Sequence, residues 1–538
     1  MKKLVLLALA LTSLNQGFSQ DMEVNWGESF EADKRYGFGD FLGTSNGKYF
    51  NLMWELKGNI AIMNPSFYPT LEVLDEDLNL LKKTPLIWED DYGWLEGHAL
   101  RGEELFFFGL TYDKKTDELA LREVKYNLNG DKLVDRVLAS FDLEKKKFKS
   151  FLEVKVSENK NHVSFFHQVQ TTKNGDPLKF QLAAYDLENE ELIYQKDFQI
   201  ADFFGEDSFY NDHVIDNRGY TYMVLNTTTG VRDKLTKATL FVFDPEGNEV
   251  HRRDMVEGDN YLRGVEFLAT ANNDIYIAAM VMNGKTNKRS RYIGYATAQL
   301  NTETFVLDNR QSAEFSEELI YKMDAKPKKD GTIKHRGAFD LQFIPKEGEN
   351  AGGYIVGEAI YSTARSERQG IIKNVTITTN FREIIAVDVS ADGSIGNATI
   401  IPKNQIGSIS YNTWNVTMGP LEYSFLPGGA PRYLMDIQKQ YFSYFAYVHD
   451  GKLNILFNGD KKNYDIDTMD DAKPMTNPRK AFTMHYVFDG KELEQNVFLE
   501  NKEFDAYFIS ERSHYEKGKA VLGAQKKKMR QYGFVKMD

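Results

Sequence analysis

The sequence contains no cysteine. This absence excludes disulfide bonds, so the fold must be held by its core and its hydrogen bonds without covalent cross-links. It also excludes thiol nucleophiles and thiolate metal sites. No cysteine is present at which a lipid anchor could be attached. We therefore expect that the protein is not a lipoprotein and that its chemistry does not depend on sulfur nucleophiles.

Long apolar runs are also absent, except at the N-terminus, where a basic pair precedes an apolar run over residues 4–14. Small residues follow at the positions that a signal peptidase reads, ending at Ser19. This pattern predicts a signal peptide over residues 1–19 and a single mature domain over residues 20–538. No later run approaches the roughly eighteen apolar residues of a membrane span. We expect an extracytoplasmic protein, periplasmic or secreted, without a membrane span.

Positive charge is in deficit, with 66 Lys and Arg against 79 Asp and Glu and a formal net charge of −13. Such a field repels nucleic acid and anionic membrane surfaces. We therefore expect no nucleic-acid partner. Because charged residues make up an ordinary 27% of the chain, the charge alone identifies no partner.

Pairs of short strands recur along the whole chain. One unit is a strand ending in Asp or Asn, a polar turn and a second strand, as in "LFVFDPEGNEV" from residue 240 and "MHYVFDGKELEQNVFL" from residue 484. A second unit of strand, turn and strand precedes each copy, as in "NDHVIDNRGYTYMVLN" from residue 211. Alternating apolar residues around Gly, Asn and Asp turns are typical of tight β-hairpins.

Two hairpins in each unit predict an all-β fold, a β-propeller of eight four-stranded blades, with seven blades as the alternative. The last unit is one strand short, and one strand near residues 22–30 is left over. We therefore expect the N-terminal strand to close the ring by completing the last blade.

Gly43, Ser45 and Gly47 fit the G-x-S-x-G pattern of a hydrolase nucleophile. That pattern requires a turn from a strand into a helix, which lifts the serine above a parallel sheet. Here a strand is expected on both sides, so we interpret Ser45 as a turn residue.

The leader ending in "FSQ", the absence of cysteine and repeats such as "KLNILFNGDKKNYD" from residue 452 resemble exported β-propeller proteins of the Bacteroidota. This resemblance implies an exported all-β protein and implies no particular activity. The cysteine pair and repeated tryptophan motif of the quinone-dependent alcohol dehydrogenases are missing, and only 5 tryptophans are present. Sialidase-type Asp boxes are missing as well.

Long insertions concentrate in the sixth and seventh blades, at about residues 317–338, 362–380, 406–439 and 458–479. The expected strand order places all four on one face and in one sector of the ring. Long loops in a compact domain are usually functional or disordered. We therefore predict a ligand face here, with Arg365 and Arg368 as candidate anion contacts and Trp414 and Tyr433 as candidate stacking platforms.

The first strand of each blade is expected to line the central channel, and it repeatedly carries an acidic residue at the same distance from the second strand. These candidate ligands of a metal ion are Asp40, Glu96, Glu153 and Glu266, and Asp340 and Asp505 take the same place once their longer turns are allowed for. Asn211 and Tyr444 take the same place in two other blades, and His98 and His213 lie two residues further in as candidate ligand contacts. Converging carboxylates need a neutralising partner, so Ca²⁺ is the cofactor that this ring suggests. Zinc is not expected, because the histidines lack metal-ligand spacing.

Two functions remain open from the sequence. The first is a binding or scaffold propeller that engages an envelope protein or a glycan through the face with the long insertions. The alternative is a glycan-active hydrolase or lyase that uses the carboxylates at the channel mouth. No residue is assigned a catalytic role.

Overall fold

The structure is a computed structural model of the chain. The residues that it describes are 24–32, 37–57, 66–87, 92–113, 118–142, 150–169, 176–204, 208–229, 235–257, 260–283, 291–323, 338–348, 352–369, 372–414, 425–426, 430–431, 438–439, 441–499, 507–516 and 518–536. The expected signal peptide lies outside these residues. Within the described ranges, no helix has the length and apolar character that crossing a membrane requires.

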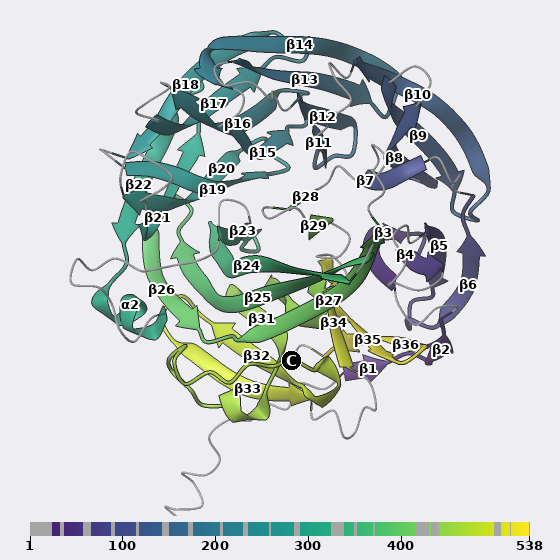
Figure 1. The fold of residues 1–538 in the computed structure, drawn as a ribbon, viewed down its shortest axis with the longest axis vertical. Coiled ribbons are helices and arrows are strands. Elements are labelled where there is room, and N and C mark those ends of the chain that lie inside the picture. Colours follow the sequence, from purple (N-terminus) through teal and green to yellow (C-terminus); the bar gives the residue numbers. More distant parts are fainter. Residues whose placement is uncertain are drawn as a thin grey trace, which may run out of the picture.

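Eight blades of antiparallel strands are arranged around a common centre (Figure 1). Blade one is β3 (Gly37–Ser45), β4 (Lys48–Lys57), β5 (Ser66–Leu74) and β6 (Leu80–Pro85). Blade two is β7 (Tyr92–Arg101), β8 (Glu104–Asp113), β9 (Glu118–Asn127) and β10 (Lys132–Asp142). Blade three is β11 (Ser150–Val156), β12 (His162–Val169), β13 (Pro177–Asp186) and β14 (Glu191–Phe204). Blades four and five are β15 (Phe209–Ile215), β16 (Thr221–Thr229), β17 (Leu235–Phe243) and β18 (Glu249–Glu257); and β19 (Asn260–Ala269), β20 (Ile275–Asn283), β21 (Arg291–Leu300) and β22 (Leu307–Glu314). A short pairing between β18 and β19 joins these two blades.

The remaining blades carry the additional elements of the fold. Blade six is β23 (Ala338–Pro345), β24 (Gly353–Gln369), β25 (Ile372–Val389) and β26 (Ile395–Ile401), and blade seven is β30 (Tyr444–His449), β31 (Lys452–Gly459), β32 (Phe482–Phe488) and β33 (Leu493–Leu499). Blade eight is β34 (Tyr507–Glu516), β35 (Lys519–Lys526) and β36 (Met529–Val535), completed by β1 (Val24–Trp26), with β2 (Phe30–Glu31) also on β36. The other elements are α2 (Glu317–Met323), β27 (Gln405–Trp414), β28 (Phe425–Leu426), β29 (Ala430–Pro431) and two short 3₁₀ helices, Lys461–Asn463 and Pro478–Lys480.

The hairpin turns form because Asp side chains bond to the backbone that follows them. In the turn between β17 and β18, Oδ1 of Asp244 accepts the backbone N–H groups of Glu246 and Asn248, at 3.1 and 2.7 Å. Asp75 and Asp216 make the corresponding bonds in blades one and four. These side chains replace a backbone partner and fix the turn, which is why Asp recurs at the hairpin turns, with Asn127 and Asn301 in the same role in the outer hairpins of blades two and five.

Apolar side chains between neighbouring blades form the core. Phe108 of β8 meets Phe165 of β12 edge to face, with 5.3 Å between the ring centroids. Tyr222, Tyr354 and Tyr532 are fully buried in similar positions between other sheets. Because each sheet buries both faces against its neighbours, the ring needs no covalent cross-link.

The ring is closed by the two ends of the chain. β1 pairs with β36 in antiparallel register, Val24 opposite Val535 and Trp26 opposite Gly533. The first strands of successive blades contact one another around the whole circle, including β34 with β3. Both the eight-bladed prediction and the predicted closure by the N-terminal strand are therefore confirmed.

Ser45 ends β3 at a tight turn into β4. Asn46 and Gly47 form this turn with φ values of 50° and 70°, and Ser45 Oγ donates to the carbonyl of Gly102 at 3.0 Å. Strands lie on both sides of the turn, as expected, so the hydrolase pattern is a coincidence of turn residues. We call this side of the ring, where first strands turn into second strands, the turn face.

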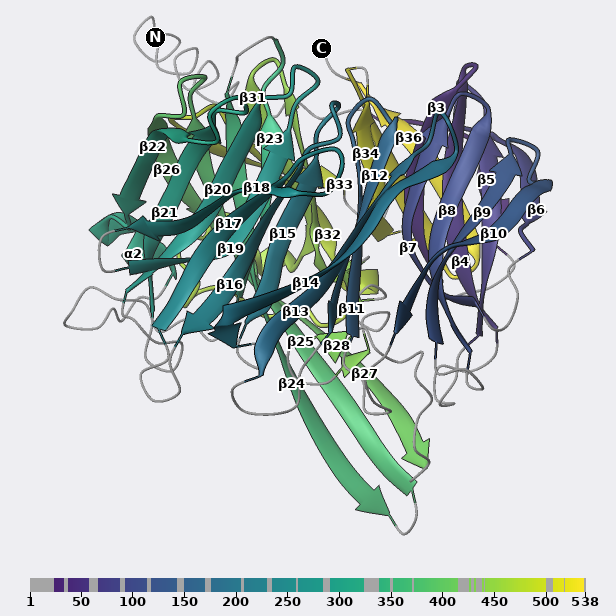
Figure 2. The ribbon, with the colours of Figure 1, turned by 90° about the horizontal axis from the view of Figure 1, so that it is seen from above.

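An arm projects from the opposite side of the ring (Figure 2). It consists of the far ends of β24 and β25, paired from Tyr361 opposite Asn380 to Gln369 opposite Ile372, with β27 added alongside β25. Residues 362–380 were expected to form a loop, and the structure shows instead that they continue the two central strands of blade six. We call this three-stranded extension the arm, and its side of the ring the arm face.

Candidate functional site

Side chains from successive first strands come together in the central channel. We call this group the channel cluster, defined by Glu153, Lys155, Asp212, Glu266, Asp340 and Tyr444. Its members lie on β11, β15, β19, β23 and β30, the first strands of blades three to seven. First strands lie nearest the ring centre (Figure 1), so alternate side chains on them face the channel.

Asp212 is the most completely bonded member of the cluster. Its carboxylate accepts Lys155 Nζ at 2.7 Å, the backbone N–H of Phe267 at 2.9 Å and the Tyr210 hydroxyl at 3.4 Å. Burial works to lower the pKa of Lys155, but the charges of Asp212 and Glu266 outweigh it and raise the pKa. Asp212 and Lys155 therefore form an ion pair that links blades three, four and five.

Glu266 lies beside this ion pair on β19. Burial raises its pKa well above the ordinary value, and the charges of Asp212, Asp340 and Glu153 add to the effect while Lys155 opposes it. The charges of two predicted ring residues, Glu153 and Asp340, thus act on a third. Among the described residues, however, these three carboxylates do not form a group whose ligand atoms lie within 4.8 Å of one another.

The arm-face end of the channel carries a second ion pair. Lys439 Nζ contacts Asp340 Oδ2 at 2.7 Å. Opposite Asp340 on β24, the buried Glu358 accepts Lys403 Nζ and the hydroxyl of Ser443. Burial lowers the pKa of Lys403 to about 8 in spite of its partner. This polar group connects the root of the arm to the channel.

The other predicted channel residues that the structure describes are not members of the cluster, although the charge of Lys155 acts on His213. His98 interacts with Asp40 of the neighbouring blade, whose charge partly offsets the burial that lowers the pKa of His98. His213 is buried and has its Nδ1 2.7 Å from the Tyr210 hydroxyl, and burial lowers its pKa to about 3. A neutral buried imidazole of this kind supports the core. The side chain of Glu96 and the whole of Asp505 lie outside the described residues.

The sequence placed Asn211 in the ring where the structure has Asp212. The pairing of β15 with β16 shifts register between Tyr210 and Asp212, which is a β-bulge with Asn211 as the extra residue. The bulge turns Asp212 toward the channel. Lys155 was also missed, although it stands two residues after Glu153 on the same strand and so faces the same side.

The arm holds three of the four predicted ligand-face residues. Arg365 is exposed on β24 and pairs with Glu367 at 3.2 Å. The backbone of Arg368 pairs with Lys373 near the tip, and that of Trp414 pairs with Ile372 at the end of β27. Tyr433 lies outside the described residues.

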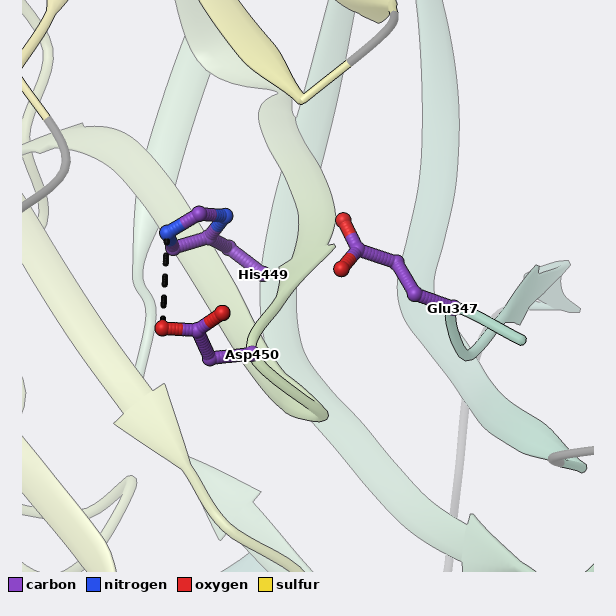
Figure 3. Close-up of side chains that lie close together, drawn as sticks. All are labelled: Glu347, His449 and Asp450. Carbon is purple, nitrogen blue, oxygen red and sulfur yellow. Dashed lines mark ion pairs between the residues drawn. The ribbon is translucent and has the colours of Figure 1, made fainter.

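A third group lies at the turn face, where Glu347, His449 and Asp450 approach one another (Figure 3). One potential ligand atom from each lies within 4.8 Å of the others, and His449 Nε2 is 3.7 Å from Asp450 Oδ2. The Tyr515 hydroxyl contacts both Glu347 and His449 Nδ1. Both carboxylates are exposed. Sequence patterns did not indicate this group, because it joins turns of two blades.

No protein-family model matches the sequence, and no curated protein is similar to it. Solved structures share its general form: the WD40 domain of SCAP from fission yeast (9% identity, TM-score 0.36, covering 96% of this chain and 99% of that one) and the polysaccharide lyase Uly1 (11%, 0.36, 96% and 100%). An ACO/RPE65 chimera is similar at 8% identity and a TM-score of 0.31, covering 74% of this chain and 97% of that one. These scores carry no argument about activity. The sheet topology defines the chain as an eight-bladed β-propeller.

Proposed function

We propose that the protein is an extracytoplasmic binding propeller that captures an extended segment of an envelope protein along the edge of its arm. The observation that supports this most is the edge of β24. β23 pairs with β24 only as far as Ile360, and among the described strands none pairs with the outer side of β24 from Tyr361 to Gln369. An unpaired edge of this kind offers backbone donors and acceptors to an added strand.

The side chains along this edge favour a peptide over a glycan. Thr363, Arg365 and Glu367 are exposed, as are Ala364 and Ser366 between them, and none of these is aromatic. Sugar rings are usually held by aromatic stacking, whereas strand addition uses the backbone and needs only tolerant side chains. The charges of Arg365 and Glu367 also protect a free edge from uncontrolled aggregation.

A shortened arm tests this proposal. Replacing residues 365–376 by Asn-Gly joins Ala364 to Ile377, which face each other in the hairpin, and leaves β27 paired with the rest of β25. A photo-cross-linking amino acid at Ser366 should give one discrete protein adduct in the native envelope. The same label at the exposed Lys48 on the turn face is the matched control and should give none.

The outcomes separate the alternatives. A partner protein that binds the shortened arm as well as the intact chain would refute edge capture, and so would an adduct at Lys48 alone. An adduct that contains carbohydrate would move the proposal to a glycan ligand. Polysaccharide turnover that depends on Glu266 would replace it with the alternative prediction, glycan cleavage in the channel.

A further inference from the structure

We propose that the turn-face group of Figure 3 binds one divalent metal ion of the Zn²⁺ class through Glu347, His449 and Asp450. This site goes beyond the proposed function, because it lies on the turn face whereas the proposed partner pairs with the arm on the opposite side of the ring. Either proposal can therefore fail while the other stands.

The distances between the potential ligand atoms are the first step of the argument. One such atom from each side chain lies within 4.8 Å of the others, and His449 Nε2 is 3.7 Å from Asp450 Oδ2. Two ligands of a tetrahedral Zn²⁺ ion, each about 2.1 Å from the metal, stand about 3.4 Å apart. Figure 3 shows the imidazole and both carboxylates pointing toward one another. Because Glu347 and Asp450 are exposed, small rotations of their side chains would bring all three ligands to one ion.

The backbone that carries these side chains is anchored between two blades. The hydroxyl of Tyr354, a buried residue of β24, donates to the carbonyl of Gly451 at 2.7 Å. This bond ties the turn that holds His449 and Asp450 to blade six, which supplies Glu347. Since the two blades are already joined here, binding an ion would cost little conformational freedom of the backbone.

Tyr515 of blade eight is an independent observation. Its hydroxyl donates to Glu347 and lies 3.4 Å from His449 Nδ1, and its ring stacks on Tyr447 with 5.1 Å between the ring centroids. Metal-binding histidines and carboxylates are usually oriented by an outer hydrogen-bond partner of this kind. A residue of a third blade therefore orients two of the three proposed ligands.

The balance of charge also favours a bound cation. Among the residues that the structure describes, no Lys or Arg lies within ion-pair distance of Glu347 or Asp450. Lys346, which precedes Glu347 in the chain, pairs instead with Asp388 at 2.5 Å. A proton on His449 would neutralise only one of the two carboxylates. A divalent cation would neutralise both and remove their mutual repulsion.

The type of metal follows from the donor atoms. Ca²⁺ and Mg²⁺ take oxygen ligands, whereas Zn²⁺ accepts an imidazole together with carboxylates. Three protein ligands also leave one tetrahedral position for water or for an atom of a partner. The expectation against zinc concerned the sequence spacing of His98 and His213, and spacing along one chain segment cannot detect ligands that two blades supply together.

Calorimetric titration of the full-length, untagged and chelator-treated protein with ZnCl₂ tests the site. One Zn²⁺ should bind per chain with a Kd of about 10 µM or below. About 1 mM CaCl₂ in the buffer should not compete, because Ca²⁺ prefers oxygen ligands alone. His449→Gln and Asp450→Asn should each weaken binding about tenfold or more. His251→Gln is the matched control, because it removes another partly exposed histidine, on β18, and should leave Zn²⁺ binding unchanged.

Tyr515→Phe gives a second readout that a purely structural role would not produce. This variant keeps the ring that stacks on Tyr447, so it should melt close to the wild type without metal, and yet bind Zn²⁺ about tenfold or more weakly. Zn²⁺ should raise the melting midpoint of the wild type but not that of His449→Gln, because only a folded-state site gives such a shift. Circular dichroism identifies folded variants, and Asp450→Asn replaces His449→Gln if the latter does not fold.

Three results would overturn the proposal. The first is absence of binding up to about 1 mM Zn²⁺, far above the expected Kd. The second is an equal loss of binding in His251→Gln and His449→Gln, which would show only unspecific binding to surface histidines. The third is blockage of Zn²⁺ binding by CaCl₂, which would show an oxygen-ligand site elsewhere in the chain.

Discussion

Glu72 and Arg530 join the first blade to the last across the closure of the ring. Glu72 lies on β5 and Arg530 on β36, their side chains are 0% and 1% exposed, and the Oε1 to Nη1 distance is 2.6 Å. The Tyr532 hydroxyl also donates to Glu72, at 3.2 Å. We predict that Glu72→Gln is one of the most destabilising conservative substitutions in the chain.

The magnitude follows from what the substitution leaves behind. In the variant, Arg530 keeps its charge in a buried site. The buried Arg512 nearby adds like charge, because burial and the charge of Arg530 lower the pKa of Arg512 whereas the charge of Glu72 raises it. Removing one partner of a buried ion pair costs about 3–5 kcal/mol. The amide oxygen of the introduced glutamine would still accept the Tyr532 hydrogen bond, so that bond adds little to the loss. The cost is a large fraction of the roughly 5–15 kcal/mol that stabilises a typical domain.

Urea unfolding of the wild type and the variant measures the difference. Glu104→Gln is the matched control, because Glu104 pairs with Lys125 at 3.1 Å but is 38% exposed, and it should cost less than about 1 kcal/mol. The double variant Glu72→Leu with Arg530→Met should recover more than half of the loss, because no carboxylate or guanidinium of the pair remains buried alone. A loss below about 1 kcal/mol in Glu72→Gln, or no recovery in the double variant, would contradict this reasoning.

Two further predictions concern the closure and the response to acid. Deleting residues 20–32 removes β1 and β2 and exposes the edge of β36. The truncated protein should therefore aggregate, or melt far below the intact protein in a thermal scan. An unchanged melting midpoint would rule out the closure. Burial lowers the pKa of His167 to about 4, against about 6.5 in the unfolded chain. The contribution of the neutral His167 side chain to the free energy of unfolding is therefore complete above about pH 6.5 and is lost as pH falls toward about 4. The loss amounts to about 3 kcal/mol, and urea unfolding of His167→Gln between pH 7 and 4.5 should show a smaller loss than the wild type; equal losses would refute the assignment.

The repeating part of the fold could be predicted from the sequence because each hairpin carries its own local signal. Asp244 and its equivalents fix the turns, and alternation of apolar residues places the strands between neighbouring blades. The shortage of one strand at the C-terminus and the spare strand at the N-terminus together predicted the closure. The spacing between first and second strands also identified Glu153 and Glu266, and Asp340 once a longer turn was allowed for, since equivalent positions of first strands face the same channel.

The arm and the exact composition of the channel could not be predicted in the same way. Strands of the arm leave the core, so polar residues such as Thr376 and Thr378 replace the apolar alternation, and only Ile377 between them is buried. Without that alternation, the sequence pattern of residues 362–380 predicts a loop. The β-bulge before Asp212 shifts the strand by one residue, and a pattern that counts residues cannot detect it. Glu347 and His449 meet only because two blades lie side by side.

The closure by β1 also constrains the order of folding. Gln531 donates to the carbonyl of Gly27 across 504 residues of chain, so β1 is synthesised long before β36 and must wait for it before the two can pair. Contacts of such long sequence separation slow folding, because the loop entropy is lost before the contact is gained. Until β1 and β36 have paired, their edges stay open to other chains. We therefore expect ring closure to be the late, slow phase of folding, and the phase most sensitive to protein concentration.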